Sequence, residues 1–207
     1  MLRNWGKYGK LVFRCGREVR AFRVYCFVLE RCLKRFCEVC VAVNIQWQWS
    51  RIEDLATKQW HHIVSLRQAV FVVEQNCPYL DADDLDLYAW HLIGWGEAQD
   101  SDGTEIEGKK CESIAVAYLR VVDPGCKYSE PSIGRVLTRI SHRRGGLGKA
   151  VMIQAMKRIS EQFPQQAIRI SAQEHLHKFY SEFGFTQTGE GYDEDGIPHI
   201  EMLKSID

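Results

Sequence analysis

The sequence has no uninterrupted run of about 18 apolar residues, the length that a membrane-crossing helix needs. Its most apolar stretch, residues 24–43, is interrupted by acidic and basic side chains. The formal net charge is +0, and a balanced charge argues against a dedicated nucleic-acid binder. We therefore expect neither a membrane nor a nucleic acid as the partner of this protein.

The sequence also lacks the paired cysteine motifs of a zinc site. Cys37 and Cys40 form one C-x-x-C unit, and the other cysteines supply no second unit at a zinc-binding spacing. His61 and His62 are adjacent, so on a helix they point apart. No secretory signal is visible, because charges interrupt the early apolar residues. We expect reduced thiols, a cytoplasmic protein and no metal.

Residues 1–44 differ in composition from the rest of the chain. Residues 1–40 carry ten Lys and Arg against three Asp and Glu, and residues 1–44 contain no serine. We interpret residues 1–44 as a basic, cysteine-rich N-terminal extension, disordered or from a non-native start, that precedes a domain at 45–207. An organelle-targeting segment is the alternative, but such segments are usually rich in serine.

Apolar spacing predicts an alternation of strands and helices after residue 44. Leu55, Trp60, Ile63, Leu66, Val70 and Val73 recur at helical intervals. Pro164 ends a second helix, Gly184 ends a third, and Asp195–Gly196 predicts a hairpin turn. We expect strands at 45–49, 89–95, 113–122, 131–138, 167–172 and in a hairpin at 191–204, and helices at 55–75, 147–163 and 174–185. This order predicts an α/β protein with a mixed sheet.

A loop at residues 76–86 carries four aspartates, Asp81, Asp83, Asp84 and Asp86. Asn, Pro and Asp at this density argue against regular structure. An ordinary solvated loop explains the aspartates. An electrostatic funnel for a cationic amine is the alternative.

The segment RRGGLGKA, residues 143–150, lies between an expected strand and an expected helix. Glycines let the backbone approach an anion, and the first turn of a helix presents free N–H groups. Arg143, Arg144 and Lys149 add positive charge, so the turn predicts a phosphate site. It is not a P-loop, because no Ser or Thr follows the Gly-Lys pair, and its glycine spacing does not match a dinucleotide fingerprint.

The spacing of Arg143, Gly146 and Gly148 resembles the acyl-CoA pyrophosphate loop of the GNAT superfamily of N-acetyltransferases. The segment KFYSEFGF adds Phe179, Tyr180 and a Gly-Phe pair at the family's spacing. The segments LRQAVFVVEQNCPYLDADDLD, IGRV, AQEHLHKFY and YDEDGIPHIEM resemble the ElaA-type branch in particular. The resemblance covers roughly residues 45–205.

This resemblance implies a central mixed β-sheet flanked by helices and splayed between its fourth and fifth strands. It further implies acetyl-CoA as the acyl donor, with the pantetheine arm pairing along the fourth strand. Gln173 lies where the family usually has an asparagine that bonds this arm. The residues expected to bind the donor are Val136, Leu137, Thr138, Arg143, Arg144, Gly145, Gly146, Leu147, Gly148, Lys149 and Gln173.

Tyr180 is the expected general acid, because a phenol stays protonated at neutral pH and can donate to a leaving thiolate. The general base is less defined, since many GNAT enzymes carry a glutamate on the fourth strand and this strand carries Arg135. Glu74 and His199 are the catalytic candidates. His91 is a further candidate, but a lone histidine in an apolar strand is more often a core residue.

The resemblance implies transfer of acetyl from acetyl-CoA to a primary amine, by direct attack in a ternary complex. The acceptor is a small-molecule or protein amine, and a homodimer is left open. One alternative is a catalytically weak acyl-CoA sensor or interaction module. Another is an adaptor that only presents the basic extension.

Overall fold

The computed structural model describes residues 45–97 and 113–206 of the 207-residue chain. The expected N-terminal extension lies outside the described residues. The polar segment DSDG, residues 100–103, predicts a hairpin between the strands at 89–95 and 113–122, and it also lies outside the described residues. Within the described part, no helix is long and apolar enough to cross a membrane.

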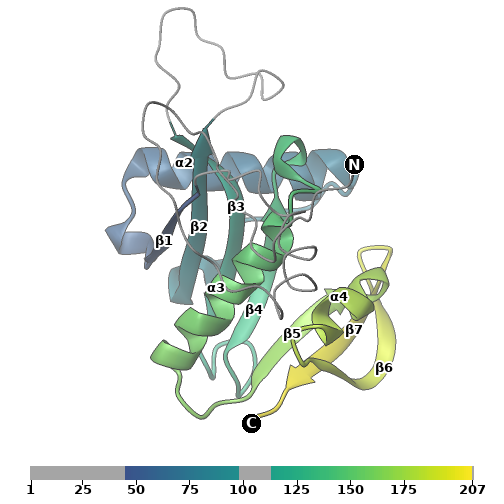
Figure 1. Ribbon diagram of the computed structural model, residues 1–207. Coiled ribbons are helices and arrows are strands. Elements are labelled where there is room, and N and C mark those ends of the chain that lie inside the picture. The colour runs from purple at the N-terminus through teal and green to yellow at the C-terminus, as the bar shows by residue number, and fades with distance from the viewer. Residues whose placement is uncertain (1–44, 98–112, 207) are drawn as a thin grey trace, which may run out of the picture. The chain divides into compact units, whose positions relative to one another are not determined.

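The order of elements agrees with the expectation from the sequence (Figure 1). The strands are β1 (Gln46–Ser50), β2 (Ala89–Glu97), β3 (Ser113–Val122), β4 (Ser132–Thr138), β5 (Ile168–Gln173), β6 (Thr186–Glu194) and β7 (Ile197–Lys204). The α-helices are α2 (Thr57–Arg67), α3 (Leu147–Gln162) and α4 (His177–Ser181). Short helical turns are the 3-10 segments η1 (Ile52–Asp54), η3 (Asp84–Tyr88), η5 (Ile140–His142) and η6 (Glu174–Leu176), and the π-helical η2 (Gln68–Glu74) continues α2.

The strands form one seven-stranded mixed sheet in the order β1-β2-β3-β4-β5-β7-β6. All neighbours are antiparallel except β4 and β5, which are parallel. In the described sheet β4 and β5 pair only near their starts, at Ser132 with Arg169 and at Ile133 with Ile170. Beyond these two positions the strands diverge. This splay between the fourth and fifth strands confirms the expected fold.

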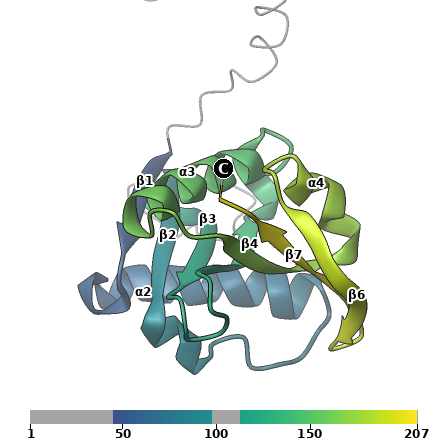
Figure 2. The same ribbon diagram turned by 90° about the horizontal axis from the view of Figure 1, so that it is seen from below.

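Two apolar cores lie on opposite faces of the sheet, and Figure 2 shows α3 on one face and α2 on the other. The α3 core includes Val151, Met152 and Ile159 and continues under β5 and β7. The α2 core packs Ile63 and Leu66 against β2 and β3. The spacing of these residues puts them on one side of each helix, so burial of that side holds the helix on the sheet.

Val73 does not belong to the buried face predicted for the first helix, because its side chain is 75% exposed. The prediction assumed 3.6 residues per turn throughout. The chain changes to π-helical geometry at Gln68, and the wider turn rotates the following residues away from the α-helical stripe. Val70, early in this segment, remains buried.

The predicted hairpin turn is confirmed, since Asp195 and Gly196 both have positive φ (55° and 80°) and join β6 to β7. Two consecutive positive φ angles are the geometry of a type I′ turn. Gly184, with φ of 86°, likewise follows α4 as expected.

Candidate active site

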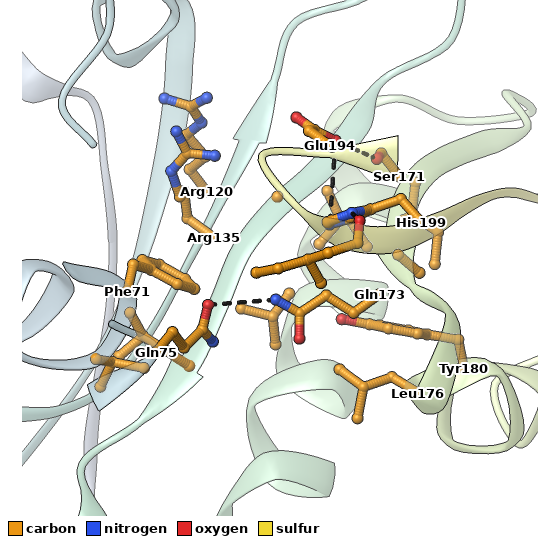
Figure 3. Close-up of a pocket in the computed structure, with 18 of the residues that line it drawn as sticks. Phe71, Gln75, Arg120, Arg135, Ser171, Gln173, Leu176, Tyr180, Glu194 and His199 are labelled. Carbon is orange, nitrogen blue, oxygen red and sulfur yellow. Dashed lines mark hydrogen bonds and ion pairs between the residues drawn. The ribbon is translucent and has the colours of Figure 1, made fainter. Parts of the chain in front are cut away.

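The splay between β4 and β5 opens into a cavity of about 560 Å³. Residues of both strands line it, together with η2 on one side and α4 and the β6–β7 hairpin on the other. Figure 3 shows Phe71 and Gln75 facing Gln173 and Tyr180 across this space. The cavity therefore runs between the two halves of the sheet.

The glycine turn lies at the start of α3. Arg144 and Gly146 have positive φ (67° and 80°) and turn the chain into the helix. A methyl group built on Gly145, Gly146 or Gly148 would meet no atom within 4 Å. The surface above these glycines is thus open at the positive end of a 16-residue helix. A diphosphate fits such a surface, because side chains would otherwise fill it.

The expected donor-binding residues divide into two groups. Val136, Leu137, Thr138, Arg143, Gly148 and Gln173 line the cavity, and Arg144, Gly145, Gly146, Leu147 and Lys149 belong to the adjoining turn. Lys149 forms an ion pair with Glu182 at 2.5 Å, so its ammonium has a protein partner.

The Arg143 guanidinium is held at three points. Its Nε donates to the carbonyl oxygen of Thr138 at 3.1 Å. Its two terminal nitrogens donate to the Glu74 carboxylate at 2.5 Å and 2.8 Å. Glu74 lines the cavity as expected of a base candidate, but its two oxygens accept from an arginine beside the glycine turn.

One edge of β4 pairs with β3, at Leu137 with Tyr118 and at Thr138 with Ala117. The register shifts between Tyr118 and Arg120, and Arg135 on β4 has a positive φ of 54°. This is a β-bulge, and bulges redirect strands next to functional sites. The other edge of β4 faces the splay, where an extended ligand could pair with it.

Tyr180 lies on α4 with its ring buried between Phe179 and Phe185. Figure 3 shows its hydroxyl directed into the cavity beside Gln173. Burial raises the pKa of the Tyr180 phenol above its usual value near 10. The phenol therefore stays protonated and can act as a hydrogen-bond donor over the whole physiological pH range.

Gln173 projects from β5 and donates to the side-chain oxygen of Gln75 at 3.3 Å, as the dashed line in Figure 3 marks. Gln75 follows η2, so this bond links the two sides of the cavity. The side-chain amide of Gln173 can bond a ligand in the splay if it gives up its hydrogen bond to Gln75.

His199 lies on β7 and lines the cavity, on the same side as Ser171 and Glu194 (Figure 3). Its Nδ1 is 2.8 Å from the carbonyl oxygen of Ile197. A carbonyl only accepts, so Nδ1 carries the proton and Nε2 keeps its lone pair in the neutral ring. Nε2 is 4.0 Å from the Glu194 carboxylate, and the ring stacks on Tyr192.

His91 does not line the cavity and is a core residue. It is fully buried, accepts at Nδ1 from the Tyr118 hydroxyl at 2.7 Å, and donates from Nε2 to the carbonyl oxygen of Asp86 at 3.1 Å. Desolvation lowers the pKa of the His91 imidazole to about 4. His91 was either a base candidate or a core residue, and the second interpretation is confirmed.

The acidic loop was interpreted either as an ordinary solvated loop or as an electrostatic funnel. Both interpretations are wrong for most of its aspartates. Asp81 and Asp86 are buried, and the loop contains a 3-10 turn. Ion pairs join the loop to three arginines, in the contacts Arg67–Asp81, Arg67–Asp86, Arg120–Asp83, Arg120–Asp86, Arg135–Asp81 and Arg135–Asp83. The aspartates pair with these arginines, two of which (Arg120 and Arg135) line the cavity, instead of attracting a ligand. Asp84 alone is exposed.

These ion pairs shift the pKa values of the residues that form them. Burial alone would raise the pKa of the Asp86 carboxyl, but hydrogen bonds and charges from Arg67 and Arg120 lower it below its usual value. Since each buried charge has an opposite partner, removal of one member would leave another uncompensated.

Sequence reasoning missed Arg120, Lys127, Ser171 and Glu194, which also line the cavity. Arg120 had a detectable signal, because it is the one charged residue in the apolar strand SIAVAYLRVV. Ser171 and Glu194 had none, because a serine on the alternating strand β5 and a glutamate on the largely exposed strand β6 both fit ordinary solvent-facing positions.

The comparisons with known proteins agree with this geometry. The family model described as an acetyltransferase (GNAT) domain matches residues 115–206. The UPF0039 protein of Synechocystis sp. is 42% identical over 161 residues, which cover 78% of this chain and 96% of that protein. Protein ElaA of Escherichia coli is 34% identical over 164 residues, which cover 78% and 97%.

Solved structures give the same result. A crystal structure described as an acyl-CoA N-acyltransferase from Pseudomonas aeruginosa superposes with a TM-score of 0.68 at 34% identity, covering 78% of this chain and 100% of that one. The crystal structure of Escherichia coli ElaA superposes with a TM-score of 0.66 at 34% identity, covering 78% and 99%.

Proposed function

Because the chain belongs to the GNAT acetyltransferase family, in its ElaA-type branch, we propose that it transfers acetyl from acetyl-CoA to a primary amine. One observation carries this proposal: a single cavity joins the open glycine turn of α3 to the Tyr180 hydroxyl and to His199. The acceptor class and a cytoplasmic location remain predictions.

The glycine turn and Arg143 would hold the CoA diphosphate. The N–H groups at the start of α3 point at the open surface above Gly146 and Gly148. Arg143 would exchange Glu74 for a phosphate oxygen, since a bidentate guanidinium suits either acceptor. The free edge of β4 near Val136, Leu137 and Thr138 would pair with the pantetheine arm, and Gln173 would bond an amide of that arm.

In the reaction, the amine nitrogen forms a bond to the thioester carbonyl carbon, the carbon–sulfur bond breaks, and CoA leaves as the thiol. A backbone N–H of β4 near Val136 would donate to the developing oxyanion, and a donor fixed in a cavity needs no reorganisation. Attack requires an unprotonated amine, because an ammonium has no lone pair.

His199 is the better placed of the two base candidates. Its Nε2 holds a lone pair at the acceptor end of the cavity, so it can take the proton that the amine loses. Glu74 would instead position Arg143, to which both of its oxygens are bonded.

Tyr180 would stabilise the leaving thiolate by donating a hydrogen bond. An ordinary thiol has a pKa of about 8.5, and burial raises the pKa of Tyr180 above 10. Complete proton transfer to the thiolate is therefore uphill by more than about one pKa unit. Tyr180 acts as a fixed donor, and the thiolate takes its proton finally from solvent or from the protonated His199.

The second candidate function is an acyl-CoA-binding sensor. Arg135 on β4, at the strand where many GNAT enzymes carry a glutamate, favours it. The experiment incubates the full chain with acetyl-CoA and single amines, follows thiol release, and weighs the amine by mass spectrometry. We expect thiol release with a matching gain of one acetyl group on the amine. Binding of acetyl-CoA with no acetylation of any amine would support the sensor.

A further inference from the structure

The end of the cavity beyond Val136 has two walls of opposite charge. Arg120 and Arg135 line one side. Glu194 and Asp195 line the other. Figure 3 shows Arg120 and Arg135 across the pocket from Glu194, Ser171 and His199. The ligand at this end therefore meets positive charge on β3 and β4 and negative charge on the β6–β7 hairpin.

The positive wall contains an unsatisfied donor. Arg120 is 4% exposed. Its terminal nitrogens donate to Asp83 and Asp86. Its Nε is buried and has no hydrogen-bond partner among the described residues. A buried donor on a charged group is destabilising when it has no partner, so a ligand oxygen at this place would be stabilising.

Gly134 gives the cavity access to this donor. The residue lines the cavity, and a methyl group built on it would have Arg120 Nε, at 4.0 Å, as its only neighbour within 4 Å. The absence of a side chain at Gly134 thus leaves open the space next to the Nε–H group.

The charges of the positive wall favour an anionic oxygen over a neutral one. Arg67, Arg120 and Arg135 are matched by Asp81, Asp83 and Asp86 through their ion pairs. Lys127 also lines the cavity. Burial lowers its pKa and the nearby Glu194 carboxylate raises it, so Lys127 is balanced by Glu194 and leaves no excess charge among these described groups. A carboxylate would accept from Arg120 Nε in a charge-assisted hydrogen bond, which is stronger than the bond that a neutral oxygen would make.

The negative wall suits an amine. Ser171 donates to Glu194 Oε2 at 3.3 Å, and Glu194 is 4.0 Å from His199 Nε2. A protonated amine beside Glu194 would lie next to the ring nitrogen that can remove its proton. Asp195, in the adjoining turn, adds to the negative potential.

We propose that the acceptor is a free amino acid, whose carboxylate binds Arg120 and whose amino group lies between Glu194 and His199. This inference rests on the proposed acetyltransferase function and names its acceptor class. A polyamine would place a second cation against the positive wall, and a lysine side chain of a protein carries no carboxylate to pair with it.

The first test separates binding from turnover. The full chain loaded with CoA, which cannot react, is titrated with each of the twenty standard L-amino acids, β-alanine and 4-aminobutyrate. The best ligand is compared with its own carboxamide, which keeps the amine and loses the carboxylate. We expect the carboxamide to bind at least about tenfold more weakly. Equal binding of acid and carboxamide, or binding of spermidine alone, would overturn the inference.

The turnover arm uses the same amines with acetyl-CoA. Acetylation of spermidine or of a terminally blocked lysine peptide, with none of an amino acid, would overturn the acceptor class and leave the acetyltransferase function standing. Carboxylate-dependent binding of an amino acid without acetylation of any amine would support the subsite and count against the proposed function.

Variants test the two walls separately. Gly134→Ala fills the space beside Arg120 Nε at a position whose φ suits any residue, and Glu194→Gln removes the charge beside the amine. Each should raise KM for the amino acid at least about tenfold with KM for acetyl-CoA within twofold. Glu190→Gln, an exposed change on the same strand as Glu194, should alter neither value. Unchanged amino-acid KM in both wall variants would overturn the inference.

Discussion

Arg143 and Glu74 bind each other through both ends of the guanidinium fork and both oxygens of the carboxylate. Arg143 is the side chain that we propose for the CoA diphosphate, and Glu74 was one of two expected bases. Their pairing joins η2 to the turn before α3, so the donor must replace Glu74 when it binds. This relationship makes the roles of the two residues separable by experiment.

Glu74→Gln should tighten CoA binding about twofold to fivefold, because it removes a competing carboxylate whose partly exposed ion pair is worth roughly 1 kcal/mol or less. Titration calorimetry with CoA measures this change. The turnover number should stay within twofold of the wild type. A loss of turnover above tenfold with unchanged CoA binding would instead identify Glu74 as the base.

His199→Gln should lower kcat at least about tenfold, since glutamine cannot take the proton from the amine. Acetyl-CoA binding should not change, because His199 is not among the residues that we propose to hold the donor. The check is kcat measured at saturating acetyl-CoA, with His177→Gln, an exposed histidine on α4, as the control. Full activity in the His199 variant would exclude it as the base.

Tyr180→Phe should lower kcat at least about tenfold and leave the dissociation constant of CoA within twofold. The hydroxyl makes no hydrogen bond within the described part of the chain, so its removal should leave the melting temperature nearly unchanged. Initial rates and thermal unfolding measure the two effects. A large fall in melting temperature with normal kcat would mean that Tyr180 serves only the core.

The free energy of unfolding should depend on pH through His91. Its pKa is about 4 in the folded protein and about 6.5 when unfolded, so the unfolded chain binds the extra proton between these values. The contribution of neutral His91 is therefore complete above about pH 6.5 and is lost as the pH falls toward 4, with roughly 2 kcal/mol lost between pH 7 and pH 5.

Urea unfolding at pH 7 and pH 5 measures this loss, and His91→Gln should abolish most of it. The carboxyls of Asp83 and Asp86, whose pKa values lie below the usual value of 3.8, titrate outside this window. His177→Gln should retain the wild-type dependence. An unchanged dependence in the His91 variant would refute the assignment.

The sequence alone was sufficient to predict features that depend on residues close together in the chain. The stripe of α3, the type I′ turn at Asp195–Gly196 and the glycine turn each depend on a few neighbouring residues. The π-helical turn after Arg67 was not predictable from apolar spacing, because the spacing assumes one helical period. Val73 was misplaced for that reason.

The residues of the candidate site were predicted from the sequence only in part, because motifs identify single residues but not contacts between distant segments. Motif residues such as Arg143 and Tyr180 could be identified one at a time. Contacts between distant segments could not, because Glu74 is 69 positions from Arg143 and Asp81 is 54 from Arg135. Composition alone therefore suggested a solvated acidic loop, where the fold supplies arginines from α2, β3 and β4 to pair with it.

The most direct test of the account is CoA binding to Gly148→Glu, measured by titration calorimetry. The new carboxylate would occupy the open space at the start of α3, where acidic residues stabilise a helix, so the melting temperature should not fall. Gln162→Glu adds the same charge at the far end of α3 and serves as the control. We expect the Gly148 variant to bind CoA at least about a hundredfold more weakly, with the control unchanged. Wild-type affinity in a folded Gly148→Glu protein would contradict the assignment of the glycine turn to the CoA diphosphate.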